Sequence, residues 1–241
     1  MKNARRQHKT KKNVILLAAV ILLFFSYIFA ANGIIPINFI FPSFSDIFPS
    51  SRQVASTDHG WNLILVNKDN YIPDNYEVEL TVLSNGQSID TRIYPSLQKM
   101  FNDMRSDGYY SIVASGYRTQ EKQQELMDEK TQAYMDEGHS KSEAKNLAEE
   151  WVAVPGTSEH QLGLAVDINQ DASLSTADEV YGWLAENAYK YGFIQRYPAD
   201  KTEITSTIYE PWHYRYVGIN AATEIYMGGI CLEEYISKLN E

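Results

Sequence analysis

The sequence predicts an α+β fold for a single exported domain, and three observations support this prediction. Segments with helical apolar spacing are interspersed with short apolar runs typical of strands, a pattern that disfavours a doubly wound parallel sheet. The 241 residues suffice for one sizeable domain plus accessory segments, and 44% of them are hydrophobic, as in ordinary globular proteins. A basic N-terminus followed by an apolar stretch predicts one transmembrane helix before that domain.

The N-terminus is predicted to be a basic cytoplasmic tail over residues 1–13 and a membrane anchor over residues 14–35. The tail contains no acidic residue and six basic ones: Lys2, Arg5, Arg6, Lys9, Lys11 and Lys12. The 18 residues from Val14 to Ala31 are almost wholly apolar. As a helix they would span about 27 Å, close to the hydrocarbon thickness of a bilayer. A cleaved signal peptide is the alternative, although Phe29-Ala30-Ala31 is a poor cleavage site.

The rest of the chain is predicted to lie outside the cell, with a stalk over residues 36–58 and the folded domain over residues 59–241. The stretch from Pro42 to Asp58 is rich in Ser and Pro, as flexible linkers are. Beyond the tail, 15 of the 21 basic residues face 31 acidic ones, a net charge of −16. This balance argues against nucleic acid as a partner and against electrostatic adsorption to an anionic surface. We therefore expect membrane attachment through the N-terminal helix alone. The expected state is a monomer.

Apolar periodicity and turn residues predict the elements of the domain in chain order. Strands are expected at 61–66, 110–114, 164–168 and 212–217. Helices are expected at 94–106, 119–137, 140–152 and 176–192, followed by helical turns at the C-terminus. Two of these helices begin with capping boxes, Ser140-x-x-Glu143 and Thr176-x-x-Glu179.

Cys231 is the only cysteine, so the domain must be stabilised by its core or by a bound metal rather than by an internal disulfide. Its neighbours Ile230 and Leu232 favour a buried apolar role over a nucleophilic one.

Candidate metal ligands occur in the block SEHQLGLAVD, residues 158–167. His160 and Asp167 are separated by six residues, and Asp167 lies between Val166 and Ile168 in a predicted strand. A carboxylate buried there needs a cation or hydrogen-bond donors. Gly163 and Ala165 are expected on the same face of the strand as Asp167, where their small size would leave room for a metal and its ligands.

A second candidate block is EPWHYRY, residues 210–216. Alternation along the strand is expected to place His213 on the face opposite Trp212 and Tyr214. Two histidines and one carboxylate form a three-ligand set that leaves a fourth position of a catalytic zinc open for water. Glu210 precedes His213 across Pro211, so its carboxylate could reach the same cavity without being a ligand. Each element alone is a weak signal, because a lone histidine beside a strand is more often a structural hydrogen-bonder.

SEHQLGLAVD and EPWHYRYVG resemble the two metal motifs of VanY-type D-alanyl-D-alanine carboxypeptidases, the zinc D,D- and L,D-carboxypeptidases of peptidoglycan. The block Ser115-Gly116-Tyr117-Arg118, with Gln123 five residues further on, resembles the upstream substrate motif of that family. The three blocks occur in the family's order between about residues 94 and 218. The resemblance therefore covers most of the predicted domain, but neither the anchor nor the stalk.

The resemblance implies a hedgehog/DD-peptidase-like α+β domain, with a small antiparallel sheet flanked by helices and with zinc as the cofactor. It implies that the enzyme removes the terminal D-alanine from peptidoglycan stem peptides. It assigns His160, Asp167 and His213 as zinc ligands, Glu210 as the catalytic base, and Arg118 as a catalytic or substrate-binding cation. It also implies substrate contacts from Ser115, Tyr117, Gln123 and Ser158.

Three alternatives stay open at the level of sequence. An L,D-carboxypeptidase would act on tetrapeptide stems, and the choice depends on cleft walls that we expect from residues 67–76 and 128–153. A cell-wall endopeptidase would need a cleft open at both ends, and a membrane anchor suits that reading less well. A non-catalytic metal-binding module of the same fold is disfavoured because Glu210 and Arg118 are both present. The expected location is the cell membrane, with one span and the catalytic domain on the wall side.

Overall fold

The computed structural model describes residues 53–241, so the predicted tail, the predicted anchor and the stalk up to residue 52 lie outside the described residues. None of the helices in this described part is both long and apolar enough to cross a bilayer. Strand β1 (Gln53–Val54) pairs in parallel with β2 (Asn70–Tyr71), and Ala55 is buried in the core. The folded part thus begins upstream of the predicted boundary at residue 59, because the Ala55 N–H donates to the Tyr71 carbonyl at 2.8 Å.

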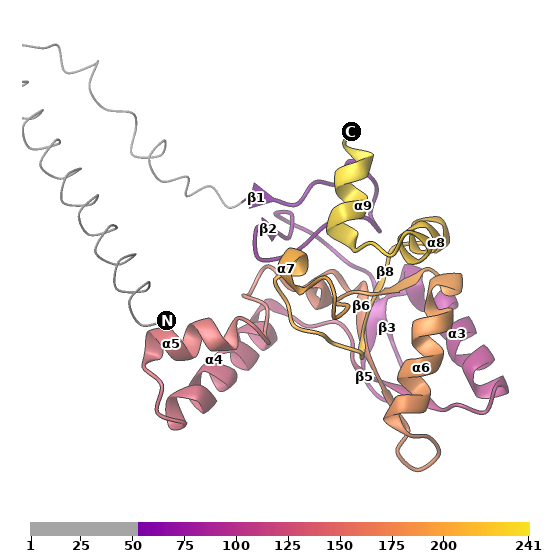
Figure 1. Ribbon diagram of the computed structural model, residues 1–241, viewed down its shortest axis with the longest axis horizontal. Coiled ribbons are helices and arrows are strands. Elements are labelled where there is room, and N and C mark those ends of the chain that lie inside the picture. The colour runs from indigo at the N-terminus through magenta and orange to yellow at the C-terminus, as the bar shows by residue number, and fades with distance from the viewer. Residues whose placement is uncertain (1–52) are drawn as a thin grey trace, which may run out of the picture. The chain divides into compact units, whose positions relative to one another are not determined.

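A four-stranded antiparallel sheet in the order β5-β6-β8-β7 organises the domain (Figure 1). Its strands are β5 (Ser111–Ser115), β6 (Ala165–Gln170), β8 (His213–Tyr216) and β7 (Phe193–Gln195). The predicted strands at 110–114, 164–168 and 212–217 are thereby confirmed. Strand β7 and the hairpin of β3 (Leu80–Val82) and β4 (Ser88–Asp90) were not predicted, because three residues are too few to establish a period.

The predicted strand at 61–66 is wrong. Ile64 and Val66 are buried in the larger core, whereas Leu63 and Leu65 pack against a second cluster, so the apolar run separates two cores. The Ile64 carbonyl accepts a hydrogen bond from the Arg215 guanidinium at 2.9 Å. The Arg215 side chain thus bonds to a backbone carbonyl that would pair with a neighbouring strand in a sheet. The run is therefore apolar like a strand but pairs with none of the described strands.

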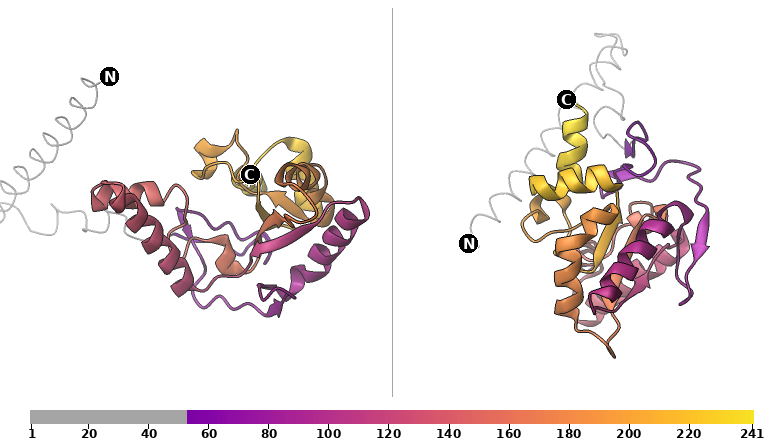
Figure 2. Two further views of the ribbon diagram at one scale, coloured as in Figure 1. Left: turned by 90° about the horizontal axis from the view of Figure 1, so that it is seen from below. Right: turned by 90° about the vertical axis from the view of Figure 1, so that its right-hand side faces the viewer.

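Six longer helices and four short helical turns of the described residues accompany the sheet. The longer ones are α3 (Tyr94–Ser106), α4 (Gln120–Asp136), α5 (Lys141–Ala148), α6 (Ala177–Asn187), α8 (Ile219–Gly228) and α9 (Leu232–Leu239). Short helical turns are η2 (Thr91–Ile93), η3 (Glu159–Leu162), η4 (Ala188–Tyr191) and α7 (Thr202–Thr205). Helices α4 and α5 lie against each other, apart from α3 and α6 (Figures 1 and 2). The predicted helices are confirmed, but α5 ends four residues earlier than expected and α6 continues to Gly192 only as η4.

The larger hydrophobic core lies between the sheet and helices α3 and α6, and the smaller one lies between β7 and helices α8 and α9. Val166 and Ile168 of β6 and Tyr214 of β8 all belong to the larger core. Successive residues of a strand point to opposite faces. Asp167 and His213 therefore point away from this core, toward the face where the candidate site lies.

Candidate active site

The sheet register brings residues from three adjacent strands together. Asp167 in the middle of β6 pairs with Ser115 of β5 on one side and with His213 of β8 on the other. The short helix η3 carries His160 and ends at Gly163, whose φ of +73° turns the chain into β6. His160, Asp167 and His213 thus meet at one place, although they are up to 53 positions apart in the sequence.

These three side chains form a compact donor cluster that fits a metal ion. His160 Nε2 lies 3.3 Å and His213 Nδ1 lies 3.2 Å from the same oxygen, Asp167 Oδ1. One ligand atom from each residue lies within 4.8 Å of the others. Asp167 Oδ1 is buried and accepts no hydrogen bond from the residues that the structure describes. Two imidazoles and a carboxylate, with one orphaned buried oxygen at their centre, are the donor set of a catalytic zinc site.

Surrounding groups orient the cluster. His160 Nδ1 lies 2.7 Å from the Gly116 carbonyl, so it donates its proton there and leaves the Nε2 lone pair free to face Asp167. The second oxygen of Asp167, Oδ2, accepts a hydrogen bond from Arg118 Nη2 at 2.8 Å. Arg118 is itself held by Ser115, whose Oγ accepts from Arg118 Nε at 3.0 Å. The Arg118 guanidinium therefore has a fixed place beside the cluster.

Burial and mutual charge shift the titration of all three donors. Burial lowers the pKa of His160 below its ordinary value despite the nearby Asp167. Burial acts the same way on His213, but contacts with Asp167 and Glu159 outweigh it and raise the pKa to about 9. Burial opposes ionisation of Asp167, yet the two histidines hold its pKa well below the usual range. Asp167 is consequently a carboxylate, the form in which it can bind a cation.

Glu210 adjoins the cluster without belonging to its three donors. Its Oε2 lies 3.5 Å from His213 Nδ1, and its side chain is 10% exposed. Burial, reinforced by the charge of Asp167, raises the pKa of Glu210 above its ordinary value. A carboxylate with a raised pKa is suited to take up and return a proton near neutral pH.

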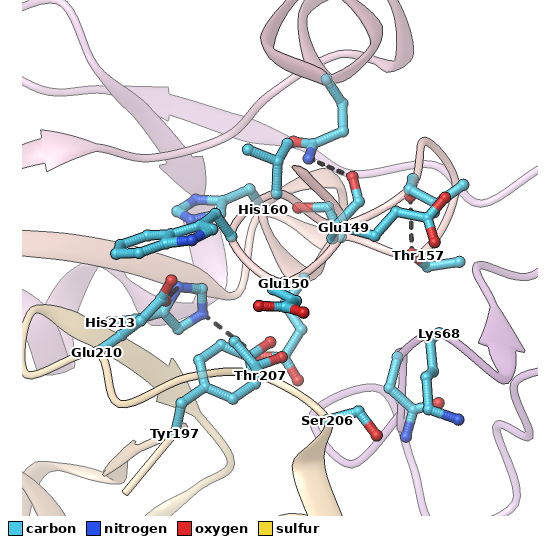
Figure 3. Close-up of a pocket in the computed structure, with 18 of the residues that line it drawn as sticks. Lys68, Glu149, Glu150, Thr157, His160, Tyr197, Ser206, Thr207, Glu210 and His213 are labelled. Carbon is cyan, nitrogen blue, oxygen red and sulfur yellow. Dashed lines mark hydrogen bonds and ion pairs between the residues drawn. The ribbon is translucent and has the colours of Figure 1, made fainter. Parts of the chain in front are cut away.

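A cleft of about 320 Å³ opens over these groups. In Figure 3, His160, His213 and Glu210 lie at one end of the pocket, and Lys68 and Ser206 lie at the other. The expected wall segments 67–76 and 128–153 do contribute, through Asn67, Lys68 and residues 149–153. A further wall, formed by residues 205–207 at the end of α7, was not predicted, because nothing in its sequence marks it.

The predicted substrate residues separate into two groups. Arg118, Gln123 and Ser158 line the cleft. Gln123 is almost fully buried. Its Nε2 donates to the Ala153 carbonyl at 2.8 Å, and its Oε1 has no hydrogen-bond partner within residues 53–241. Ser115 and Tyr117 do not line it: Ser115 holds Arg118, and the Tyr117 N–H donates to the Ser88 carbonyl at 2.6 Å.

Two expectations about neighbouring residues were wrong. Gly163 does not make room for a metal; a Cβ there would meet the Asp90 nitrogen at 3.1 Å, so the glycine permits close packing against the β4 end. Trp212 precedes β8 and lines the cleft, so it does not share the core-facing side of Tyr214 as strand alternation suggested. Cys231 is buried at the start of α9, in keeping with the expected apolar role.

Glu159, Arg196, Arg215 and Glu233 form a buried charged group beside the site that sequence reasoning missed. Glu159 lies between the predicted site residues Ser158 and His160, but glutamate is a residue type that is usually exposed. Arg215 offered a usable signal, because a cation two residues after His213 in a buried strand requires an anionic partner.

The chain is similar to known proteins in both sequence and structure. The family model of VanY, D-alanyl-D-alanine carboxypeptidase, matches residues 86–219. A D-alanyl-D-alanine carboxypeptidase of Enterococcus faecalis is 65% identical over 188 residues, which cover 78% of this chain and 70% of that protein. The structure of VanYB in complex with D-alanine-D-alanine is 65% identical with a TM-score of 0.72, covering 73% of this chain and 98% of that one.

A second solved structure is as similar to this chain as the first. It is a mutant of the vancomycin resistance D,D-pentapeptidase VanY in complex with Zn(II), 65% identical with a TM-score of 0.72. The match covers 73% of this chain and 99% of that one. These matches confirm the α+β fold of the described residues.

Proposed function

Because the chain belongs to the VanY family of D-alanyl-D-alanine carboxypeptidases, we propose that it is a zinc-dependent hydrolase that removes the terminal D-alanine from peptidoglycan stem peptides. One observation carries this proposal: the cluster of His160, Asp167 and His213 lies in the same cleft as Glu210 and Arg118. A metal-binding module without activity would need neither of the last two residues at that place.

His160 Nε2, Asp167 Oδ1 and His213 Nδ1 would hold the zinc ion. When bound, zinc supplies a Lewis acid that lowers the pKa of water to about 7 and polarises a carbonyl group. The three donors come from β6, from β8 and from the η3 turn that leads into β6, so they belong to the rigid part of the domain.

Glu210 is the group placed to move protons. Its carboxylate accepts a proton as a water oxygen attacks the scissile carbonyl carbon, and it returns that proton to the departing amine as the C–N bond breaks. D-Alanine then leaves as a free amino acid and the shortened stem keeps a new carboxylate. Burial of Glu210 supports this role, because it brings the pKa closer to neutrality.

Arg118 is the cation placed to meet negative charge on the substrate. Ser115 and Asp167 engage its Nε and Nη2, which leaves Nη1 for the substrate. The partner is either the oxyanion that develops on the scissile carbonyl or the free carboxylate of the terminal residue. Gln123 and Ser158 line the same cleft.

The likeness to a D,D-pentapeptidase supports D,D-carboxypeptidase activity rather than the L,D alternative. We further propose that the enzyme acts on the wall side of the membrane, held by one N-terminal span. The basic residues before Val14 and the apolar stretch after it support that placement.

The test is the release of D-alanine from synthetic pentapeptide and tetrapeptide stems, before and after chelation. We expect hydrolysis of the pentapeptide, its loss on chelation, and its return with added zinc. Faster cleavage of the tetrapeptide would establish the L,D alternative instead, and full activity after exhaustive chelation would refute the zinc mechanism.

A variant tests the role of Glu210. Glu210→Gln should retain zinc, because Glu210 lies outside the three donors, and should lower kcat by about 10²- to 10⁴-fold, the usual contribution of one general acid–base group. Glu203→Gln, on an exposed glutamate outside the cleft, is the control. An unchanged rate in zinc-loaded Glu210→Gln would remove this residue from the mechanism.

A further inference from the structure

A buried carboxylate lies directly behind His213. The Glu159 side chain is fully buried, and its Oε1 accepts hydrogen bonds from Arg196 Nε and Arg215 Nη1, each at 2.8 Å. Both arginine side chains are fully buried as well. A buried charge at this depth is tolerated only with such partners.

The other oxygen of Glu159 is unpartnered and faces an unpartnered nitrogen. Glu159 Oε2 and His213 Nε2 are both buried without a hydrogen bond in the described part of the chain, and they lie 3.6 Å from each other. The opposite ring nitrogen, Nδ1, lies 3.2 Å from Asp167 Oδ1 in the donor cluster. The two nitrogens of His213 therefore face two different groups, a proposed ligand set on one side and a carboxylate on the other.

We propose that Glu159 is a positioning residue that accepts the Nε2–H of His213 and thereby keeps the Nδ1 lone pair directed at the zinc ion. The inference rests on the proposed function, since it assigns Nδ1 as a zinc donor. The two atoms lie 3.6 Å apart, so a small movement of either side chain brings them to hydrogen-bond distance. A histidine that binds a metal nearly always donates its other N–H to such an acceptor.

The surroundings of Glu159 hold its carboxylate in this orientation. Arg215 also donates to the Ile64 carbonyl at 2.9 Å, and Arg196 donates to both oxygens of Glu233 on α9, at 2.9 and 2.6 Å. Glu159 is consequently held by two arginines, which are themselves fixed by the backbone at Ile64 and by Glu233. His160, by contrast, uses the Gly116 carbonyl for the same purpose.

Replacing Glu159 by glutamine tests the proposal, with Glu233→Gln as the matched control. With its oxygen on the arginines, the amide introduced by Glu159→Gln would donate to His213 Nε2 and move the ring proton to Nδ1, the proposed ligand atom. Glu233→Gln removes a carboxylate from the same Arg196 but does not touch His213. Both variants should lose stability, whereas only the first should alter the metal site.

The readout is zinc affinity, measured by competition with a chromogenic chelator. We expect Glu159→Gln to weaken zinc binding by about 10- to 100-fold, the usual effect of losing such an acceptor. Glu233→Gln should change it by less than about threefold. Cobalt-substituted protein should show altered visible absorption bands in Glu159→Gln alone. Unchanged zinc affinity in Glu159→Gln, or equal losses in both variants, would overturn the positioning role.

A measurement on the wild-type protein covers the case in which Glu159→Gln does not fold. Histidine-selective ¹H,¹⁵N NMR of the zinc-loaded protein should show the His213 proton on Nε2, shifted downfield by its hydrogen bond to the Glu159 carboxylate. A proton on Nδ1, or an Nε2–H without that shift, would overturn the proposal. A wild-type protein that bound no zinc would instead refute the proposed function itself, so the two failures are distinguishable.

Discussion

Arg118→Lys separates the two roles open to this guanidinium. The wild-type side chain uses Nε for Ser115 Oγ and Nη2 for Asp167 Oδ2, which leaves Nη1 for the substrate. Lysine keeps the positive charge and can keep the ion pair with Asp167, but its ammonium lacks the rigid planar fork that holds Nη1 toward the substrate while Nη2 holds Asp167. The variant thus removes one substrate donor while retaining a cation beside the metal ligand.

The expected loss follows from that single donor. A preorganised donor to a developing oxyanion typically contributes about 2.7–4 kcal/mol, so kcat should fall by about 10²- to 10³-fold. In that role kcat and kcat/KM fall together and KM stays constant. If Arg118 instead grips the terminal carboxylate, most of the loss appears as a higher KM. A substrate with an amidated C-terminus then removes the difference between variant and wild type.

The assay is steady-state release of D-alanine at saturating zinc, because Arg118 also contacts the proposed ligand Asp167. Arg105→Lys, on an exposed position of α3 outside the cleft, is the control. A zinc-saturated Arg118→Lys enzyme within about threefold of the wild-type kcat/KM would refute both roles and make Arg118 a support for Asp167 only.

Two further predictions concern stability. Glu233→Gln should lower the free energy of unfolding at pH 7 by about 3 kcal/mol, because it breaks a buried ion pair. Burial opposes ionisation of Glu233, but Arg196 outweighs it and holds the pKa of this carboxyl below its ordinary value of 4.5. The ion pair therefore stabilises the fold fully above pH 4.5, and this stabilisation is lost as the pH falls further. Urea unfolding should therefore show a smaller difference between variant and wild type at about pH 3 than at pH 7; equal differences would contradict this. Gly163→Ala should lower stability by about 1–3 kcal/mol, since a Cβ would crowd Asp90 and Val78 at a φ of +73°. Gly86→Ala, with a φ of +85° and open space around it, should cost less in the same thermal unfolding experiment, and an equal loss would show that crowding plays no part.

The sequence was sufficient to predict the elements with a clear period. Helices α3 and α4 and strands β5, β6 and β8 were predicted because each shows a sustained apolar pattern or a marked boundary. His160, Asp167 and His213 were assigned from residue chemistry and from the family resemblance, and the structure brings them together. Such residues are recognisable because a carboxylate or histidine inside an apolar strand needs a partner.

What the sequence did not reveal depends on long-range partners. Glutamates such as Glu159 and Glu233 are usually exposed. Only the fold shows that these two lie in the interior, where Arg196 and Arg215 neutralise them. The run at 61–66 had the apolar content of a strand, but nothing local shows that a guanidinium would bind its carbonyl groups. Charge pairing between residues distant in the sequence is therefore the main information that required the structure.

The pairing of Ser115, Asp167 and His213 across adjacent strands limits how the chain can change in length. Removing one residue from β6 would turn Asp167 toward the apolar core and would bring Val166 or Ile168 to the site, so insertions and deletions are excluded there. The cleft walls at residues 67–68, 149–153 and 205–207 lie outside the four-stranded sheet. Loops of other lengths can be exchanged at these walls while the donor cluster keeps its geometry. New substrate preferences are accordingly most accessible through loop grafting.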